Sequence, residues 1–104
     1  MHQRGGHFNP ASSVHGGPAD AQRHAGDLGN VEASAQGIVD VTFTDSCVSL
    51  LPASAASIVG RSVVLHADED DLGRGGHSDS LTTGHAGARI ACGVIGLAAD
   101  VEML

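Results

Sequence analysis

The most regular alternation of apolar and polar residues in this chain falls in a few short segments. Residues 38–44 (IVDVTFT) alternate apolar and polar side chains, which is the period of a half-buried β-strand. Residues 57–66 (SIVGRSVVLH) are rich in β-branched residues, and residues 89–97 (RIACGVIGL) combine Ile and Val with small residues. These patterns predict three strands, and we expect a fourth near residues 31–34 as a partner for the first.

Two long polar segments without a hydrophobic period separate these strands. Residues 5–30 are rich in Gly, Pro, Asn and His, and residues 67–88 are polar and rich in Gly. Loops of this length are usually functional or disordered. The sequence therefore predicts one all-β domain over residues 1–104, with an open sheet, because four strands are too few to close a barrel.

The composition predicts a thin hydrophobic core. The chain has 104 residues and is 41% hydrophobic, but much of that fraction is alanine, and there are two Phe and no Trp or Tyr. Few side chains can therefore bury a large apolar area. The 15 glycines favour a loop-rich β protein over a helical bundle.

The charge of the chain argues against two classes of partner. The formal net charge is −7 and the sequence contains no lysine, whereas nucleic acids and anionic membranes are bound by clustered cations. No segment approaches the ~20 apolar residues of a membrane span, and residues 1–6 lack the apolar stretch of a secretory signal. We expect a cytoplasmic protein, with an extracellular location left open in case a signal precedes this sequence.

The first polar segment holds a candidate metal site. Three imidazoles and a carboxylate fall within 21 residues, which suits a tetrahedral zinc ion: His7, His15, His24 and Asp27. Glycines within the segment would let it fold back so that the four side chains converge. The residues alone leave a second interpretation open, in which these are solvated loop histidines.

Five segments of the chain carry a family resemblance. They are HFNP (7–10), HGGP (15–18), RHAGDLGN (23–30), VVLHADEDDLGRGG (63–76) and GARIACGVIG (87–96). In this order they resemble the copper/zinc superoxide dismutases, from His7 to Ala98. The resemblance implies a Greek-key β-barrel or sandwich, present here with about half of its strands. It also implies copper and zinc cofactors, a homodimer and an antioxidant enzyme that acts on superoxide.

The resemblance assigns a role to each site residue. Zinc would be held by His7, His15, His24 and Asp27, and copper by His66 together with His7, whose imidazolate bridges the two metals. Asp70 would orient His15 from outside the ligand set. Arg89 would dock superoxide beside copper, so His7 and Arg89 are the catalytic candidates.

Other features of the family pattern are missing or altered. The family places two more copper-ligand histidines in an HVH motif upstream of HFNP, where this chain has six residues without that motif; His2 lies off it. Cys92 matches the cysteine of the family disulfide, but the position of its partner is also upstream. Cys47 matches no family cysteine, and we expect it to be a small buried apolar residue.

The second polar segment resembles the electrostatic loop of the family. The acidic run from Asp68 to Asp71, followed by Arg74, matches the loop that guides the anion toward copper; superoxide dismutase is a standard example of such focusing. Thr82 stands where many relatives have lysine, and His85 where many have asparagine. This difference predicts either weaker steering or neutral surface variation.

The sequence thus predicts a superoxide dismutase that disproportionates superoxide to oxygen and hydrogen peroxide, with an incomplete copper site. We expect zinc to bind and copper turnover to be poor unless a second chain supplies the missing strands and ligands. One alternative is a catalytically silent zinc-binding or interaction module that pairs with full-length subunits. Another is the superoxide dismutase-like domain of a copper chaperone, which ranks lower because His66 is kept and no CxC or MxCxxC motif occurs.

Overall fold

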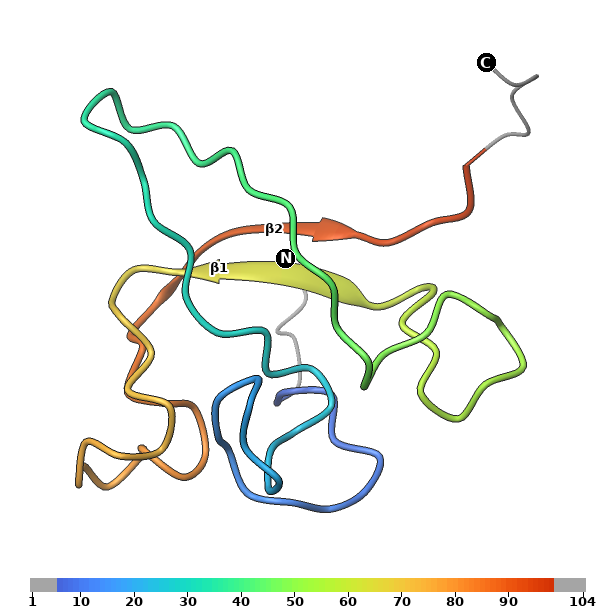
Figure 1. Cartoon of the computed structure of the whole chain (residues 1–104), viewed down its shortest axis with the longest axis horizontal. Helices are drawn as coiled ribbons and strands as arrows, with labels where there is room; N and C mark the ends of the chain where they lie inside the picture. Colours follow the sequence, from blue (N-terminus) through green and yellow to red (C-terminus); the bar gives the residue numbers. More distant parts are fainter. Residues whose placement is uncertain (1–5, 99–104) are drawn as a thin grey trace.

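The computed structural model describes residues 6–98, and β-strand is the only regular secondary structure in that range (Figure 1). Strand β1 spans Ser62–His66 and strand β2 spans Arg89–Val94, and the two pair in antiparallel fashion. The strands predicted at 57–66 and 89–97 are therefore confirmed with shorter bounds. The all-β class is confirmed as well.

The ladder between β1 and β2 contains an irregularity beside the polar loops. Pairing is regular as far as Leu65, which lies opposite Ala91, and then shifts so that His66 lies opposite Arg89. Ile90 is the extra residue of this β-bulge. In an unbroken ladder His66 would lie opposite Ile90, so the bulge brings Arg89 into register with His66.

The predicted strands at 31–34 and 38–44 are wrong, since neither segment is a strand in the described structure. A tight turn joins them, in which the backbone N–H of Gly37 donates to Ser34 O (2.8 Å) and that of Ser34 donates to Ile38 O (2.8 Å). In Figure 1 the tip of this segment, drawn in teal to green, projects away from the sheet. Alternation specifies which side chains share a face, but a strand also needs a neighbouring backbone to pair with.

Burial in the described residues is concentrated on polar side chains. Ala86 is the one buried hydrophobic residue of that range, whereas the buried polar residues are His15, Arg23, His24, Asp27 and Ser80. Apolar side chains on the strands, such as Ile90 and Val94, are exposed. Cys47 is exposed as well, so its predicted burial is wrong: it lies in a bend in which its backbone N–H donates to Asp45 Oδ2 (2.9 Å).

The buried polar centre lies where the two long loops meet. Residues 6–30 and 67–88 contain no helix or strand and lie below the sheet in the view of Figure 1. The backbone N–H of His15 donates to Leu81 O (2.9 Å), and the exposed Arg74 forms an ion pair with Asp20. Nowhere in residues 6–98 is there a helix long and apolar enough to cross a membrane.

Candidate metal centre

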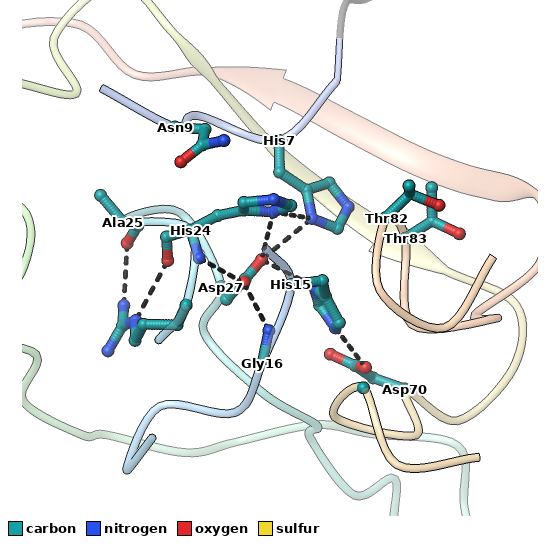
Figure 2. A network of polar contacts seen from close by, with 12 residues as sticks. His7, Asn9, His15, Gly16, His24, Ala25, Asp27, Asp70, Thr82 and Thr83 are labelled. Carbon is teal, nitrogen blue, oxygen red and sulfur yellow. Dashed lines mark hydrogen bonds and ion pairs between the residues drawn. The ribbon is translucent and has the colours of Figure 1, made fainter. Parts of the chain in front are cut away.

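Three histidines and an aspartate of the first loop converge on one point, as Figure 2 shows. One ligand atom from each of His7, His15, His24 and Asp27 lies within 4.8 Å of all the others. The distances from Asp27 Oδ1 to the Nδ1 atoms of these histidines are 2.9, 2.9 and 3.3 Å respectively. Zinc with bonds of 2.0–2.1 Å in a tetrahedron places its ligand atoms about 3.3 Å apart, so the distances from Asp27 Oδ1 to the three nitrogens are close to those of a zinc site.

One atom of this cluster supports a metal rather than a hydrogen-bond network. His15 Nδ1 is buried and lies 2.9 Å from Asp27 Oδ1, yet it has no hydrogen-bond partner. A buried polar nitrogen in this state is costly. A zinc ion between the four side chains would satisfy it, so the donor set fits the metal.

The carboxylate of Asp27 is oriented by the backbone. Its Oδ2 accepts hydrogen bonds from the N–H groups of Gly16 (3.1 Å) and His24 (2.7 Å), which turns Oδ1 toward the histidines. Burial acts to raise the pKa of Asp27, but the hydrogen bond from His7 and the two backbone N–H groups outweigh burial and lower the pKa to about 2. Asp27 is therefore anionic at neutral pH, the form in which a carboxylate can bind a metal.

The histidine next to this carboxylate is kept in its neutral form. Burial lowers the pKa of His24 and outweighs the opposing attraction of Asp27, and the neighbouring imidazoles lower the pKa further. A metal ligand must carry a lone pair, and neutral imidazole supplies one.

His15 is oriented by a residue from the second loop. Its Nε2 lies 2.7 Å from Asp70 Oδ1, and its side chain is 1% exposed. Because a carboxylate only accepts, Nε2 carries the proton and Nδ1 presents its lone pair to the cluster. Asn30 holds Asp70 in turn: its Nδ2 donates to Asp70 O (2.9 Å), and Asp70 N donates to Asn30 Oδ1 (2.8 Å).

Gly84 gives this contact the space it needs. Its φ is +73°, and a Cβ built on it would overlap both Asp70 Oδ1 and His15 Nε2. Neither Gly84 nor Asn30 was predicted as a site residue from the sequence. Asn30 belongs to the RHAGDLGN segment, so the motif contained the residue but not its contact.

Arg23 is a third residue that was not predicted from the sequence. It is buried and donates to the carbonyl oxygens of Pro18 (3.0 Å), His24 (3.1 Å) and Ala25 (2.8 Å), and it forms an ion pair with Asp45 (2.8 Å). Burial acts to raise the pKa of Asp45, but the hydrogen bond from Arg23 outweighs it and the pKa is lowered. Arg23 thus fixes the backbone on both sides of His24.

A cleft opens beside the cluster and contains the remaining predicted site residues. His7, His66 and Arg89 all line it, and the ring centroids of His7 and His66 are 6.2 Å apart. His66 Nδ1 lies 3.1 Å from Gly87 O, and since a carbonyl only accepts, Nδ1 carries the proton and Nε2 the lone pair. His7 thus contributes to both the cluster and the cleft.

The structure brings most of the predicted site residues together. The four zinc candidates and Asp70 form one network, and His66 and Arg89 lie at the adjoining cleft. Cys92 is exposed and lies opposite Val64 in the ladder. His2 lies outside the described residues.

Known proteins match this chain over most of its length. The family described as copper/zinc superoxide dismutase (SODC) matches residues 1–95. Superoxide dismutase [Cu-Zn] 2 of Mesembryanthemum crystallinum is 57% identical over 97 residues, which cover 93% of this chain and 61% of that protein. Superoxide dismutase [Cu-Zn] of Yarrowia lipolytica is 57% identical over 95 residues, covering 91% of this chain and 60% of that protein.

The chain therefore spans about three-fifths of the length of these relatives. The family has a β-barrel or sandwich fold, in agreement with the strands and the absence of helix in residues 6–98. By this match, the chain belongs to the copper/zinc superoxide dismutase family.

Proposed function

We propose that this chain forms the zinc-binding and anion-binding part of an enzyme that disproportionates superoxide to oxygen and hydrogen peroxide. The observation that carries the proposal is the position of His7: its Nδ1 belongs to the four-ligand cluster, while its ring lines the cleft with His66 and Arg89. One imidazole thus joins a metal site to a site for the substrate.

The residues of the chain divide between two metals. His7, His15, His24 and Asp27 would hold zinc, and His66 with His7 would contribute to copper. Bound copper supplies one-electron chemistry, by which one superoxide is oxidised to oxygen and a second is reduced and takes up two protons to give hydrogen peroxide. Zinc has no redox chemistry and would fix the first loop.

Arg89 is the residue that we expect to bind the anion. It is a cationic residue that lines the same cleft as His66, opposite which it lies in the ladder. A cation there attracts superoxide and holds it beside His66. Gly87 O keeps the proton of His66 on Nδ1, so Nε2 keeps the lone pair with which it could bind copper.

A catalytically silent zinc module is the second candidate. Of the histidines lining the cleft in residues 6–98, only His66 lies outside the zinc cluster, whereas the family pattern asks for two more copper ligands. A copper ion held by His7 and His66 alone would have an incomplete set of imidazoles. By comparison, all four candidate zinc ligands are present in this chain.

We also propose that a second chain supplies further strands, and that the complete protein is a cytoplasmic homodimer. Support comes from the two-stranded sheet, on which Val63, Ile90 and Val94 are all more than half exposed. Exposed apolar side chains and unpaired strand edges favour association with another sheet.

Superoxide consumption by the chain loaded with zinc and copper tests the enzymatic proposal. We expect Arg89→Gln to lower kcat/KM about tenfold or more, because a charge-assisted contact contributes roughly 1.5–3 kcal/mol. Arg61→Gln is the control, since Arg61 lies over the Phe8 ring and does not line this cleft. If the loaded chain consumes no superoxide while it retains zinc, the silent zinc module is the correct function.

A further inference from the structure

A short turn in the first loop separates two of the candidate zinc ligands, His7 and His15. Its sequence, NPAS at residues 9–12, is typical of a β-turn, because Asn favours the first position and Pro the second. The backbone N–H of Ser12 donates to Asn9 O (3.3 Å), as the hydrogen bond of such a turn does. The chain therefore reverses its direction between the two ligands.

The side chain of Asn9 closes this turn. Its Oδ1 accepts from the backbone N–H of Ser13 (2.8 Å), and its Nδ2 donates to Ser13 O (2.9 Å). Both polar atoms of the amide are thus used by the backbone, although Asn9 lines the same cleft as His7 and His24 (Figure 2). Asn9 therefore acts on the path of the chain.

The closed turn contains a residue in the left-handed conformation. Ser12 has a φ of 56°, which is unfavourable for a residue with a side chain. The hydrogen bonds between Asn9 and Ser13 offset this cost, since they hold the chain on both sides of Ser12. Without them, residues 9–13 would favour another path.

The turn connects two segments that are fastened elsewhere. Before the turn, the backbone N–H of Gly26 donates to Phe8 O (3.0 Å). After the turn, the backbone N–H of His15 donates to Leu81 O (2.9 Å). Only six residues separate Phe8 from His15, so their path limits where the ring of His7 can lie relative to that of His15.

We propose that Asn9 is a positioning residue of the metal centre, because by closing the turn on Ser13 it sets the placement of His7 relative to His15. The inference rests on the proposed function, in which both histidines bind zinc. It adds to that function a residue of the HFNP segment to which the family resemblance assigned no role.

The zinc affinity of Asn9→Ala, measured by competition with a chelator, tests the inference without a catalytic readout. Zinc binding requires an ordered first loop, so the cost of ordering a turn that is no longer closed reduces the affinity. Groups that orient metal ligands typically change the affinity 10- to 100-fold, and we expect the Kd for zinc to rise about tenfold. Gln22→Ala is the matched control, because it removes an exposed amide of the same loop and should leave the Kd unchanged.

The visible spectrum of the cobalt-saturated chain separates positioning from stability. At saturation, weaker binding no longer matters, and the absorption band reports the geometry of the bound ion. The band of Asn9→Ala should differ in wavelength or intensity from that of the unmodified chain. Gln22→Ala should reproduce the unmodified band.

A second change at Ser12 tests the turn itself. Gly adopts a positive φ without steric cost, so adding Ser12→Gly to Asn9→Ala should recover about threefold in zinc affinity. Adding Ser12→Ala, which keeps a Cβ, should recover none. If Asn9→Ala alone binds cobalt too weakly to be saturated, the band is measured in the variant that also carries Ser12→Gly.

The outcomes separate this inference from the function on which it rests. If the unmodified chain binds one zinc and Asn9→Ala matches both its affinity and its cobalt band, the inference alone is overturned. A lower zinc affinity with an unchanged band, or equal recovery by Ser12→Gly and Ser12→Ala, would mean that Asn9 only stabilises the loop, which also overturns the inference. If the unmodified chain gives no tetrahedral cobalt band, the proposed zinc site fails and the inference fails with it.

Discussion

The contact between His15 and Asp70 depends on a residue that has no side chain. Gly84 lies against both partners with a φ of +73°, and a methyl group there would occupy the space of their hydrogen bond. Residues that orient a zinc-ligand histidine typically change metal affinity 10- to 100-fold. We therefore predict that Gly84→Ala weakens zinc binding by about tenfold or more, as measured by competition with a chelator.

Gly76 offers a matched control for this change. Its φ is +74°, but a Cβ there would meet nothing within 4 Å. Gly76→Ala should share the backbone strain of roughly 1–2 kcal/mol and leave the zinc affinity unchanged. Equal loss of zinc affinity in both variants would mean that backbone strain, and not the His15–Asp70 contact, is responsible.

Asp27 predicts the acid sensitivity of the metal-free chain. Its pKa is lowered from 3.8 to about 2, so the folded state binds fewer protons than the unfolded state. The resulting stabilisation, about 2 kcal/mol, is fully present above a pH of about 4 and is lost as the pH falls toward 2. Denaturant unfolding in the presence of a chelator at several pH values measures this stabilisation. Asp27→Asn should flatten the dependence of the unfolding free energy on pH between about 2 and 4.

At the scale of elements, the first loop is held by a buried ion pair and the second by an exposed one. The Arg23 and Asp45 side chains are 5% and 9% exposed, whereas that of Arg74 is 61% exposed. Removing one partner of a buried pair costs about 3–5 kcal/mol, and exposed pairs contribute about 1 kcal/mol or less. We predict that Arg23→Gln destabilises the zinc-loaded chain by about 3 kcal/mol and Arg74→Gln by less than 1 kcal/mol, as measured by urea unfolding. Comparable losses would show that burial does not separate the two pairs.

The strands illustrate what local pattern predicts. Residues 62–66 and 89–94 form strands because their segments contain β-branched residues and each pairs with the other in an antiparallel ladder. Residues 38–44 show a better alternation but form no strand, because pairing depends on a neighbouring backbone that the pattern does not specify. The bulge at Ile90, which sets the register of Arg89, also left no signal in the sequence.

The part of the site that was predictable from the sequence consists of residue types that commonly bind metals. His7, His15, His24 and Asp27 are ligand types in a compact stretch, and the motif supplied their roles. Asn30 and Gly84 were not predictable, because their importance arises from contacts with Asp70, which lies 40 residues from Asn30 in the sequence. Arg23 has no motif of its own for a similar reason: its partner Asp45 is 22 residues away.

At the scale of the whole molecule, the buried centre of the described residues is polar, and most large apolar side chains of the sheet are exposed. A chain arranged in this way gains little from hydrophobic burial, so metal binding should contribute a large share of its stability. Zinc present at about 1,000 times its Kd would add about 4 kcal/mol. Folding and zinc binding are therefore expected to be closely coupled.

The most direct test of this account is cobalt(II) titration of the chain, followed by displacement with zinc. The account predicts the visible absorption of one tetrahedral cobalt per chain, displaced by one equivalent of zinc. The band should disappear in His15→Ala and persist in His77→Ala, because His77 lies outside the four-ligand cluster. Absence of the band in the unmodified chain, or its persistence in His15→Ala, would contradict the assignment of zinc to His7, His15, His24 and Asp27.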